Sequence, residues 1–235
     1  MTLHLTNVRL IDPEAGTDHL GHLSVAAGGR IAAISHDGAA PPGARDCGGA
    51  CLAPGILDVG VKVGEPGERH KESFASAGRA AARGGVTTIV TRPDTAPAID
   101  TPEVLEFVTR RAAEECAVRI APMAALTKGR DGREMTELSF LMDAGAVAFS
   151  DGDRVVTDTR VLSRAMTYAR GLGALVVAHV QEPGLSAGAV ATAGKFASLK
   201  GLPAVSPMAE RMGLDRDLAL VEMTGVRYHA DQITA

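Results

Sequence analysis

Short apolar segments alternate with amphipathic segments from residue 55 onward, and this alternation limits the possible folds more than any other feature of the sequence. The apolar segments have the length of strands and are hydrophobic on both faces, as in a buried parallel sheet. The segments between them carry apolar residues at helical spacing, for example Val104, Leu105, Val108 and Ala112. Strands that alternate with such helices form βα units. The sequence therefore predicts an α/β fold.

About six βα units can be counted along the chain. The expected strands cover residues 56–63, 86–91, 118–124, 146–149, 175–179 and 226–232. The expected helices cover residues 72–83, a segment capped by Thr101 with Pro102 at its first position, and residues 136–145, 159–172 and 207–224. A closed (β/α)8 barrel has eight strands and about 250 residues. We therefore expect a partial (β/α)8 TIM-type barrel with open strand edges, and a chain that is a fragment or one piece of a split polypeptide.

The first 52 residues have a different pattern. Short alternating segments such as residues 3–6, 8–11 and 31–34 are separated by turn sequences at Asp12-Pro13 and at residues 41–43. This pattern is typical of a small β domain. We expect residues 1–52 to form an N-terminal β-sandwich subdomain and residues 53–235 to form the truncated barrel.

Composition excludes several classes of protein. With 46% hydrophobic and 22% charged residues the 235-residue chain can bury a core, and its net charge of -4 leaves no basic surface for nucleic acid. No apolar run approaches the roughly 18 residues that span a bilayer, and the N-terminus lacks a signal-peptide pattern. The three cysteines, Cys47, Cys51 and Cys116, are too few and scattered for a disulfide framework. We expect a cytoplasmic protein that binds neither nucleic acid nor membrane.

The sequence PGILDVGVKVGEPG at residues 54–67 reads as the first barrel strand and its loop. Side chains alternate along a strand, so Asp58, Gly60, Lys62 and Gly64 are expected to share one face. The loop after such a strand faces the active site of a parallel barrel. This face is therefore where ligands of a functional site are expected.

This stretch resembles the first barrel strand of the dihydroorotases, amidohydrolases that close or open dihydroorotate in pyrimidine biosynthesis. In that family the frame reads Asp-x-His-x-His-x-Arg-Glu-Pro-Gly, with both histidines on metal and the arginine on the substrate carboxylate. The resemblance places Gly60 and Lys62 at the two metal-ligand positions and Gly64 at the substrate position. It implies an amidohydrolase barrel that keeps the scaffold and lacks these three groups.

Two segments keep a metal-ligand position of the same family. Residues 145–152 (GAVAFSDG) carry Asp151 where one class of dihydroorotases binds metal through aspartate, and residues 178–182 (AHVQE) carry His179 at a third histidine position. Each also has a structural interpretation. Asp-Gly after a strand is typical of a turn, and a histidine that ends an apolar strand is commonly a hydrogen-bonded core residue.

Two other segments have lost a functional group of the family. Residues 87–95 (TTIVTRPDT) place Asp94 where a substrate-binding asparagine is expected, and a carboxylate there would repel the substrate carboxylate. Residues 229–234 (HADQIT) place Gln232 where a metal-binding histidine is expected. The family's general-base aspartate belongs to strand eight, beyond Ala235.

Asp151 and His179 alone would hold zinc weakly, because zinc enzymes usually provide three protein ligands. We therefore predict no cofactor, although zinc is implied for active relatives, and no catalytic residue. The resemblance implies a catalytically inactive dihydroorotase-like protein that acts as structural partner of aspartate carbamoyltransferase in an oligomer. The alternatives are an active zinc dihydroorotase completed by a second chain, or a related allantoinase or hydantoinase.

Lys62 carries the most specific expectation. A buried carboxylate without its metal needs a counter-charge, because an unpaired charge in a low-dielectric site loses hydration. The alternation of the first strand points Lys62 inward. We therefore expect its ammonium to occupy the vacated metal position and to pair with Asp151, Asp58 or both.

Overall fold

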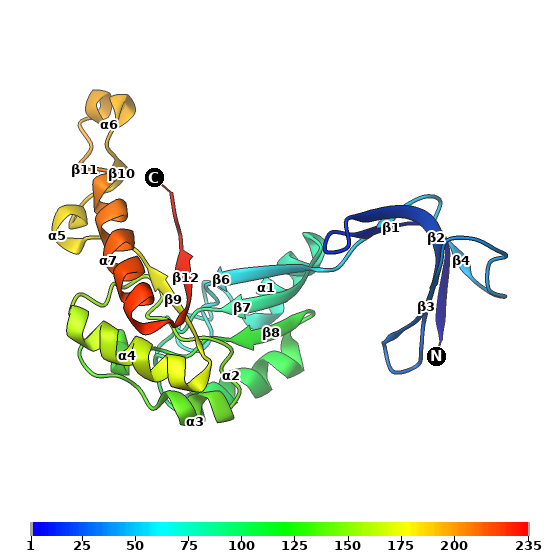
Figure 1. Cartoon of the computed structure of the whole chain (residues 1–235), viewed down its shortest axis with the longest axis horizontal. Helices are drawn as coiled ribbons and strands as arrows, with labels where there is room; N and C mark the ends of the chain where they lie inside the picture. The colour runs from blue at the N-terminus through cyan, green and yellow to red at the C-terminus, as the bar shows by residue number, and fades with distance from the viewer. Residues whose placement is uncertain (1, 235) are drawn as a thin grey trace. The chain divides into compact units, whose positions relative to one another are not determined.

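The chain divides into two compact units, Met1–Gly55 and Ile56–Ala235. The computed structural model describes residues 2–234. Figure 1 follows the chain from the N-terminal strands in blue to strand β12 in red. Each unit has a hydrophobic core of its own.

The N-terminal unit contains a five-stranded sheet. Its strands are β1 (Leu3–Asp12), β2 (Thr17–Val25), β3 (Ile31–Ser35), β4 (Arg45–Asp46) and β5 (Cys51–Leu52). Strands β1, β2 and β3 form an antiparallel meander, and the two short strands pair with β1 in parallel. Among the described residues of this unit there is one sheet, so the second layer of a β-sandwich stays a prediction.

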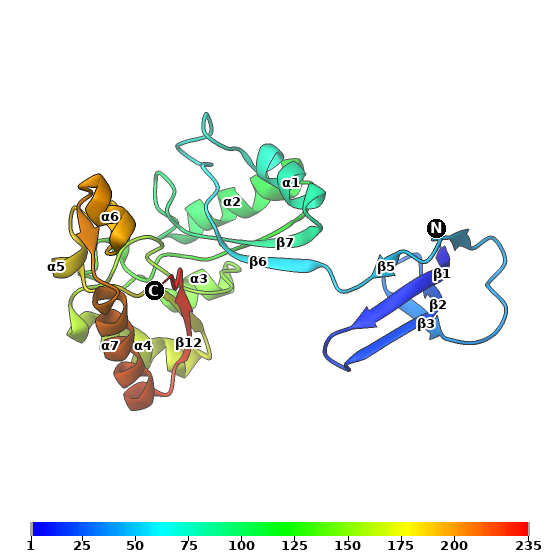
Figure 2. The same ribbon diagram turned by 90° about the horizontal axis from the view of Figure 1, so that it is seen from above.

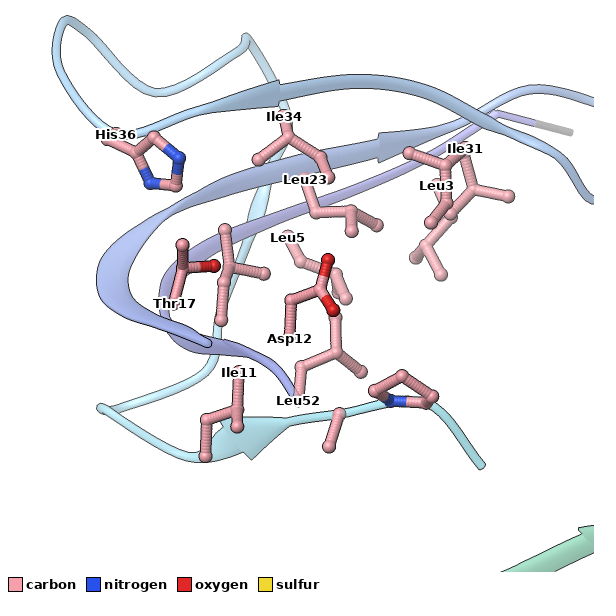
Figure 3. A pocket seen from close by; sticks show the side chains of 14 residues that line it. Leu3, Leu5, Ile11, Asp12, Thr17, Leu23, Ile31, Ile34, His36 and Leu52 are labelled. Carbon is pink, nitrogen blue, oxygen red and sulfur yellow. The ribbon is translucent and has the colours of Figure 1, made fainter. Parts of the chain in front are cut away.

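Apolar side chains of this sheet line an open groove of about 730 Å³. Figure 3 shows Leu5, Leu23 and Ile34 beside it. Ile31 and Ile34 are 61% and 53% exposed, so the groove leaves apolar surface in contact with water. It belongs entirely to the N-terminal unit, whereas every candidate site residue belongs to the other unit.

The second unit is built on parallel strands that lie in chain order. They are β6 (Ile56–Val61), β7 (Val86–Thr91), β8 (Arg119–Pro122), β9 (Leu175–His179) and β12 (Arg227–Asp231). Strands β6, β7 and β8 form one ladder, and β9 pairs with β12. The five expected strands outside residues 146–149 are thus confirmed, with small differences at their ends.

Phe149 connects the two ladders. Its N–H donates to the carbonyl of Leu175 (2.9 Å), and its own carbonyl accepts from the N–H of Val177 (2.8 Å). On the other side, Ala124 exchanges backbone hydrogen bonds with Ala148 and Ser150. The expected strand at 146–149 is present as this short connection and not as a regular strand.

Helices follow the strands as the sequence predicts. The main ones are α1 (Phe74–Arg83), α2 (Pro102–Glu115), α3 (Leu138–Asp143), α4 (Thr159–Leu172) and α7 (Met208–Thr224). Figure 2 shows α1 and α2 on the same side of β6 and β7. Between β9 and α7 the chain also forms short elements that the sequence did not predict: α5 (Pro183–Ser186), β10 (Ala191–Thr192), α6 (Lys195–Lys200) and β11 (Ala204–Val205).

Local sequence explains where these helices begin and end. Ser73 and Ser76 form a reciprocal capping box at the start of α1, and Asp158 accepts from two backbone amides at the start of α4. Gly173 ends α4 with a φ of 68°, a left-handed conformation that favours glycine. Thr101 was expected to cap α2, but its side chain makes no cap hydrogen bond, and Pro102 alone marks the start.

The core lies between the strands and these helices. Phe74, Leu105, Phe149 and Met166 are fully buried in a single cluster that includes residues of every main helix. Such a core confirms the α/β class. Closure into a barrel is not shown within residues 2–234, because no strand pairing joins β6 to β12, and Ile56 and Leu57 on β6 are 55% and 57% exposed.

No helix in residues 2–234 combines the length and the apolar character needed to cross a bilayer.

Candidate functional site

The carboxyl ends of the parallel strands carry most of the side chains that the sequence singles out. Lys62 follows β6, Asp94 follows β7, Asp151 follows the Phe149 connection, His179 ends β9 and Gln232 follows β12. This is the edge at which parallel barrels place their active sites. The term mouth is used below for these residues and the loops between them.

Gly60 is a bulge inside β6. The pairing of β6 with β7 shifts between Val59 and Val61, and Gly60 has a φ of 85°, which side-chain-bearing residues rarely adopt. A Cβ atom at this position would lie 3.1 and 3.2 Å from the two carboxylate oxygens of Asp231. The backbone and Asp231 together leave no room for the imidazole that the family has here.

Lys62 does not pair with Asp151 or Asp58, so this expectation was wrong. Its ammonium lies 3.4 Å from Asp94 Oδ2 and 3.6 Å from Glu68 Oε2. The bulge at Gly60 breaks the strict alternation of β6, and the strand ends before Lys62, so the predicted inward register does not hold. The side chain is 45% exposed and reaches across to the loop after β7.

Asp94 is the most buried charge that pairs with Lys62. Its side chain is 1% exposed, and Arg92 Nη2 donates to its Oδ2 at 2.8 Å. Its other oxygen, Oδ1, is buried and has no hydrogen-bond partner. The position that carries a substrate-binding amide in the family thus holds a carboxylate neutralised by two cations of this chain.

Gly64 lies in a tight turn that excludes a side chain. Its carbonyl accepts from Glu68 N at 2.6 Å, and a Cβ atom on Gly64 would lie 2.5 Å from the backbone oxygen of Glu68. An arginine at this position would require the loop to change. The position at which the resemblance implies a substrate-binding arginine is therefore closed by backbone.

Glu65, in the retained Glu-Pro-Gly sequence, anchors this loop. It accepts from Phe74 N at 3.2 Å and from Arg111 Nε at 3.1 Å, and it lies 3.6 Å from Arg69 Nε. Sequence reasoning missed Arg111, because it comes from α2 and no local motif marks it. The Glu-Pro-Gly sequence is thus explained here by loop structure.

Asp151 is held by the loop after β8. Its carboxylate accepts from the backbone N–H groups of Leu126 (3.1 Å) and Thr127 (2.9 Å) and from the Thr127 hydroxyl (2.5 Å). Burial raises the pKa of this carboxyl, and the hydrogen bonds from Thr127 and Leu126 partly offset the rise. The nearby Arg130 donates to the backbone carbonyl of Asp151 at 2.9 Å.

His179 borders an open cavity of about 470 Å³ that Arg130, Arg154 and Gln181 also line. Its Nδ1 atom is buried without a partner. The interpretation of His179 as a hydrogen-bonded core residue therefore has no support at Nδ1. Its neighbours at the cavity include two cationic side chains.

Gln232 has a φ of 58°, and its amide donates to Asp231 Oδ2 at 3.2 Å. Its side chain therefore supports the carboxylate that lies against Gly60. The amide is a neutral group and a poor substitute for an imidazole ligand.

These residues do not fit a zinc site. Among residues 2–234, no three His, Cys, Asp or Glu side chains lie close enough together to hold a metal ion. The oxygens of Asp151 are engaged by Thr127 and backbone amides. The donor set that a catalytic zinc requires is absent from the described residues.

A family model described as dihydro-orotase-like matches residues 49–235. The chain belongs to this dihydroorotase-like family. It is 42% identical over 240 residues to a dihydroorotase-like protein of Pseudomonas putida and 39% identical to one of Pseudomonas aeruginosa. Each alignment covers 100% of this chain and 56% of the relative. The chain thus spans little more than half the length of these dihydroorotase-like relatives.

Solved structures support the fold. An L-hydantoinase (dihydropyrimidinase) from Arthrobacter aurescens superposes with a TM-score of 0.79 at 22% identity, over 97% of this chain and 52% of that one. At this identity the match bears on the fold alone. The α/β architecture of the dihydroorotase-like chain therefore corresponds to about half of a hydantoinase chain.

Proposed function

We propose that this chain is a catalytically inactive dihydroorotase-like protein of de novo pyrimidine biosynthesis and a structural partner of aspartate carbamoyltransferase. The first part is supported by the groups that stand at three positions where the resemblance implies metal ligands. A glycine bulge, a lysine ammonium paired with Asp94, and the Gln232 amide stand at three ligand positions. Without a metal there is no activated hydroxide and no polarised amide carbonyl for cyclic-amide chemistry.

The groups at the mouth also fit the family's substrate poorly. Asp94 offers acceptor oxygens where a substrate carboxylate would need a donor, and its own carboxylate already takes up Arg92; the turn at Gly64 leaves no room for an arginine. The partner is supported by family resemblance alone, and the cytoplasmic location stays an expectation from the sequence. The proposed contribution is to present a barrel-derived surface within an oligomer.

The test combines metal analysis with turnover on one preparation. Elemental analysis of the purified chain should give far less than one zinc per chain, and neither carbamoyl aspartate nor dihydroorotate should be converted. One tightly held metal per chain, with turnover that a chelator abolishes, would instead indicate an active dihydroorotase. Turnover of hydantoins or allantoin would indicate the related cyclic-amide hydrolases.

The partner is tested by mixing. Static light scattering after size exclusion should show a complex of this chain with aspartate carbamoyltransferase and none with ornithine carbamoyltransferase as control. Separate elution of the two proteins at micromolar concentration would contradict the partner assignment.

A further inference from the structure

Buried polar atoms without a hydrogen-bond partner gather at the mouth. Within residues 2–234 they are Thr91 Oγ1, Arg92 Nε, Asp94 Oδ1, Arg130 Nε and His179 Nδ1. Each lies at or just beyond the carboxyl end of a strand of the second unit, or in the loop after β8. Such atoms are rare in native proteins and call for an explanation at each place. The first three share one segment, at the end of β7.

Two cations converge on a single oxygen of Asp94, which lies in that segment. Arg92 Nη2 lies 2.8 Å and Lys62 Nζ 3.4 Å from Asp94 Oδ2, while Asp94 Oδ1 has no partner. A third cation is close, because a Cβ atom on Gly152 would lie 3.2 Å from both Arg130 Nη1 and Asp94 Cβ. Arg130 itself is engaged by Asp153 at 2.8 Å.

Lys62 and Arg92 come from different loops, so their convergence on Asp94 is not the result of a single local turn. Lys62 comes from the loop after β6, and Arg92 and Asp94 from the loop after β7. The Arg92 N–H donates to the carbonyl of Val61 at 2.9 Å, which ties the two loops together. The two cations are therefore held near each other by backbone pairing that does not depend on the Asp94 side chain.

We propose that Lys62 and Arg92 form a carboxylate-binding site that the chain fills with its own Asp94. Asp94 acts as an internal ligand, and at 1% exposure it leaves no space for an external one. It is then a specificity-determining residue that keeps small carboxylates out of the mouth. This proposal rests on the proposed function and concerns the same site. It is tested by anion binding, whereas the proposed function is tested by metal content and turnover, so one of the two proposals can fail while the other holds.

The chemistry favours carboxylates over other anions. Guanidinium and ammonium donors both bind carboxylate oxygens, and the Asp94 side chain, which is 1% exposed, occupies the space of one carboxylate group. Removing the Asp94 carboxylate by Asp94→Ala deletes a carbon and two oxygens, which are the heavy atoms of formate. Phosphate is larger than a carboxylate group and carries more negative charge. Arg92 and Lys62 together would not compensate that charge, because Lys62 is already shared with Glu68.

The experiment is rescue of Asp94→Ala by formate. Thermal unfolding of the full chain is followed with increasing formate at constant ionic strength, with chloride as the balancing salt. We expect Asp94→Ala to melt below the native chain and formate to raise its Tm saturably, because a ligand that binds only the folded state stabilises it. The formate concentration that gives half of the rise in Tm for Asp94→Ala should be at least about tenfold lower than the concentration at which formate changes the Tm of the native chain.

Two variants serve as controls. Asp18→Ala removes the carboxylate of another arginine pair, Arg9 with Asp18, which is about half exposed and not enclosed. The Tm of Asp18→Ala should be the same in formate as in chloride at equal ionic strength. Asp94→Ala combined with Arg92→Met keeps the space but removes a cation, and it should lose the response to formate.

Several results would overturn the proposal. They are equal effects of formate and chloride on Asp94→Ala, equal binding of formate by the native chain, or stabilisation by phosphate as strong as that by formate. If Asp94→Ala is recovered only as aggregate, the readout becomes refolding yield, which must rise in formate and not in chloride. An unchanged yield would count against the site.

Discussion

The Asp231 carboxylate lies against Gly60, so that a Cβ atom on the glycine would be 3.1 Å from Oδ1 and 3.2 Å from Oδ2. Gly60 is on β6 and Asp231 ends β12, and Figure 1 shows these two strands near each other. Strands β6 and β12 therefore approach each other at the mouth, although they are not paired. At the position where the resemblance implies the first metal ligand, the side chain is absent. The space that an imidazole would need there is occupied by the Asp231 carboxylate.

We predict that Gly60→His destabilises the chain and does not create a metal site. The φ of 85° strains a side-chain-bearing residue, and the imidazole must displace Asp231. Together these should lower the free energy of unfolding by about 2 to 4 kcal/mol. Urea unfolding measures the change. Gly171→His on the exposed surface of α4, where a Cβ atom meets nothing within 4 Å, is the matched control and should change little. Equal effects of the two variants would contradict the explanation.

A second prediction concerns the partner of Lys62. In a double-mutant cycle of Lys62→Met and Asp94→Asn, the coupling should be about 1 kcal/mol, reduced by the partial exposure of the lysine. The cycle of Lys62→Met with Asp151→Asn should show none beyond about 0.5 kcal/mol. Chemical unfolding of the six proteins gives both values. Coupling to Asp151 in place of Asp94 would restore the expectation drawn from the sequence.

The strands were predictable because periodicity is a property of neighbouring residues. Residues 86–91 and 175–179 appear as β7 and β9 with the expected ends, since each apolar run is bounded by glycine or a polar loop. The strand expected at 56–63 ends at Val61 and contains a bulge at Gly60, where Asp231, a residue far away in the chain, fills the space beside the glycine. Family resemblance singled out the positions at the mouth, and their roles stay predictions.

Side-chain partners at the mouth were less predictable. Arg92 and Asp94 are two residues apart and their pairing could be suspected, but the ties between Glu65 and Arg111 or between Asp151 and Thr127 join separate elements. No local pattern marks such pairs, because their members are 46 and 24 residues apart in the sequence. The error about Lys62 has the same origin, as the chosen partner depended on an ideal strand register.

A third prediction follows from the loop anchor. Glu65→Ala should lower the free energy of unfolding by about 2 kcal/mol, because the buried carboxylate accepts the first amide of α1 and pairs with Arg111. Glu114→Ala removes a more distant, exposed partner of the same arginine, at 3.9 Å, and should leave stability unchanged within error. Urea unfolding of both variants is the measurement. Equal losses would show that Arg111 pairing in general, and not the Glu65 anchor, determines stability.

The last prediction concerns the open edge of the sheet. Ile56 and Leu57 on β6 are 55% and 57% exposed, and an exposed apolar edge strand pairs readily with other chains. The isolated 235-residue chain should therefore self-associate in size exclusion as its concentration rises. Leu57→Lys should shift it toward monomer, because a charge on an edge strand opposes pairing. Phe107→Lys on α2, at a similarly exposed apolar side chain away from the edge, is the control and should leave association unchanged. A sharp monomer peak for the native chain at all concentrations, with cooperative thermal unfolding, would show that the edge is already protected.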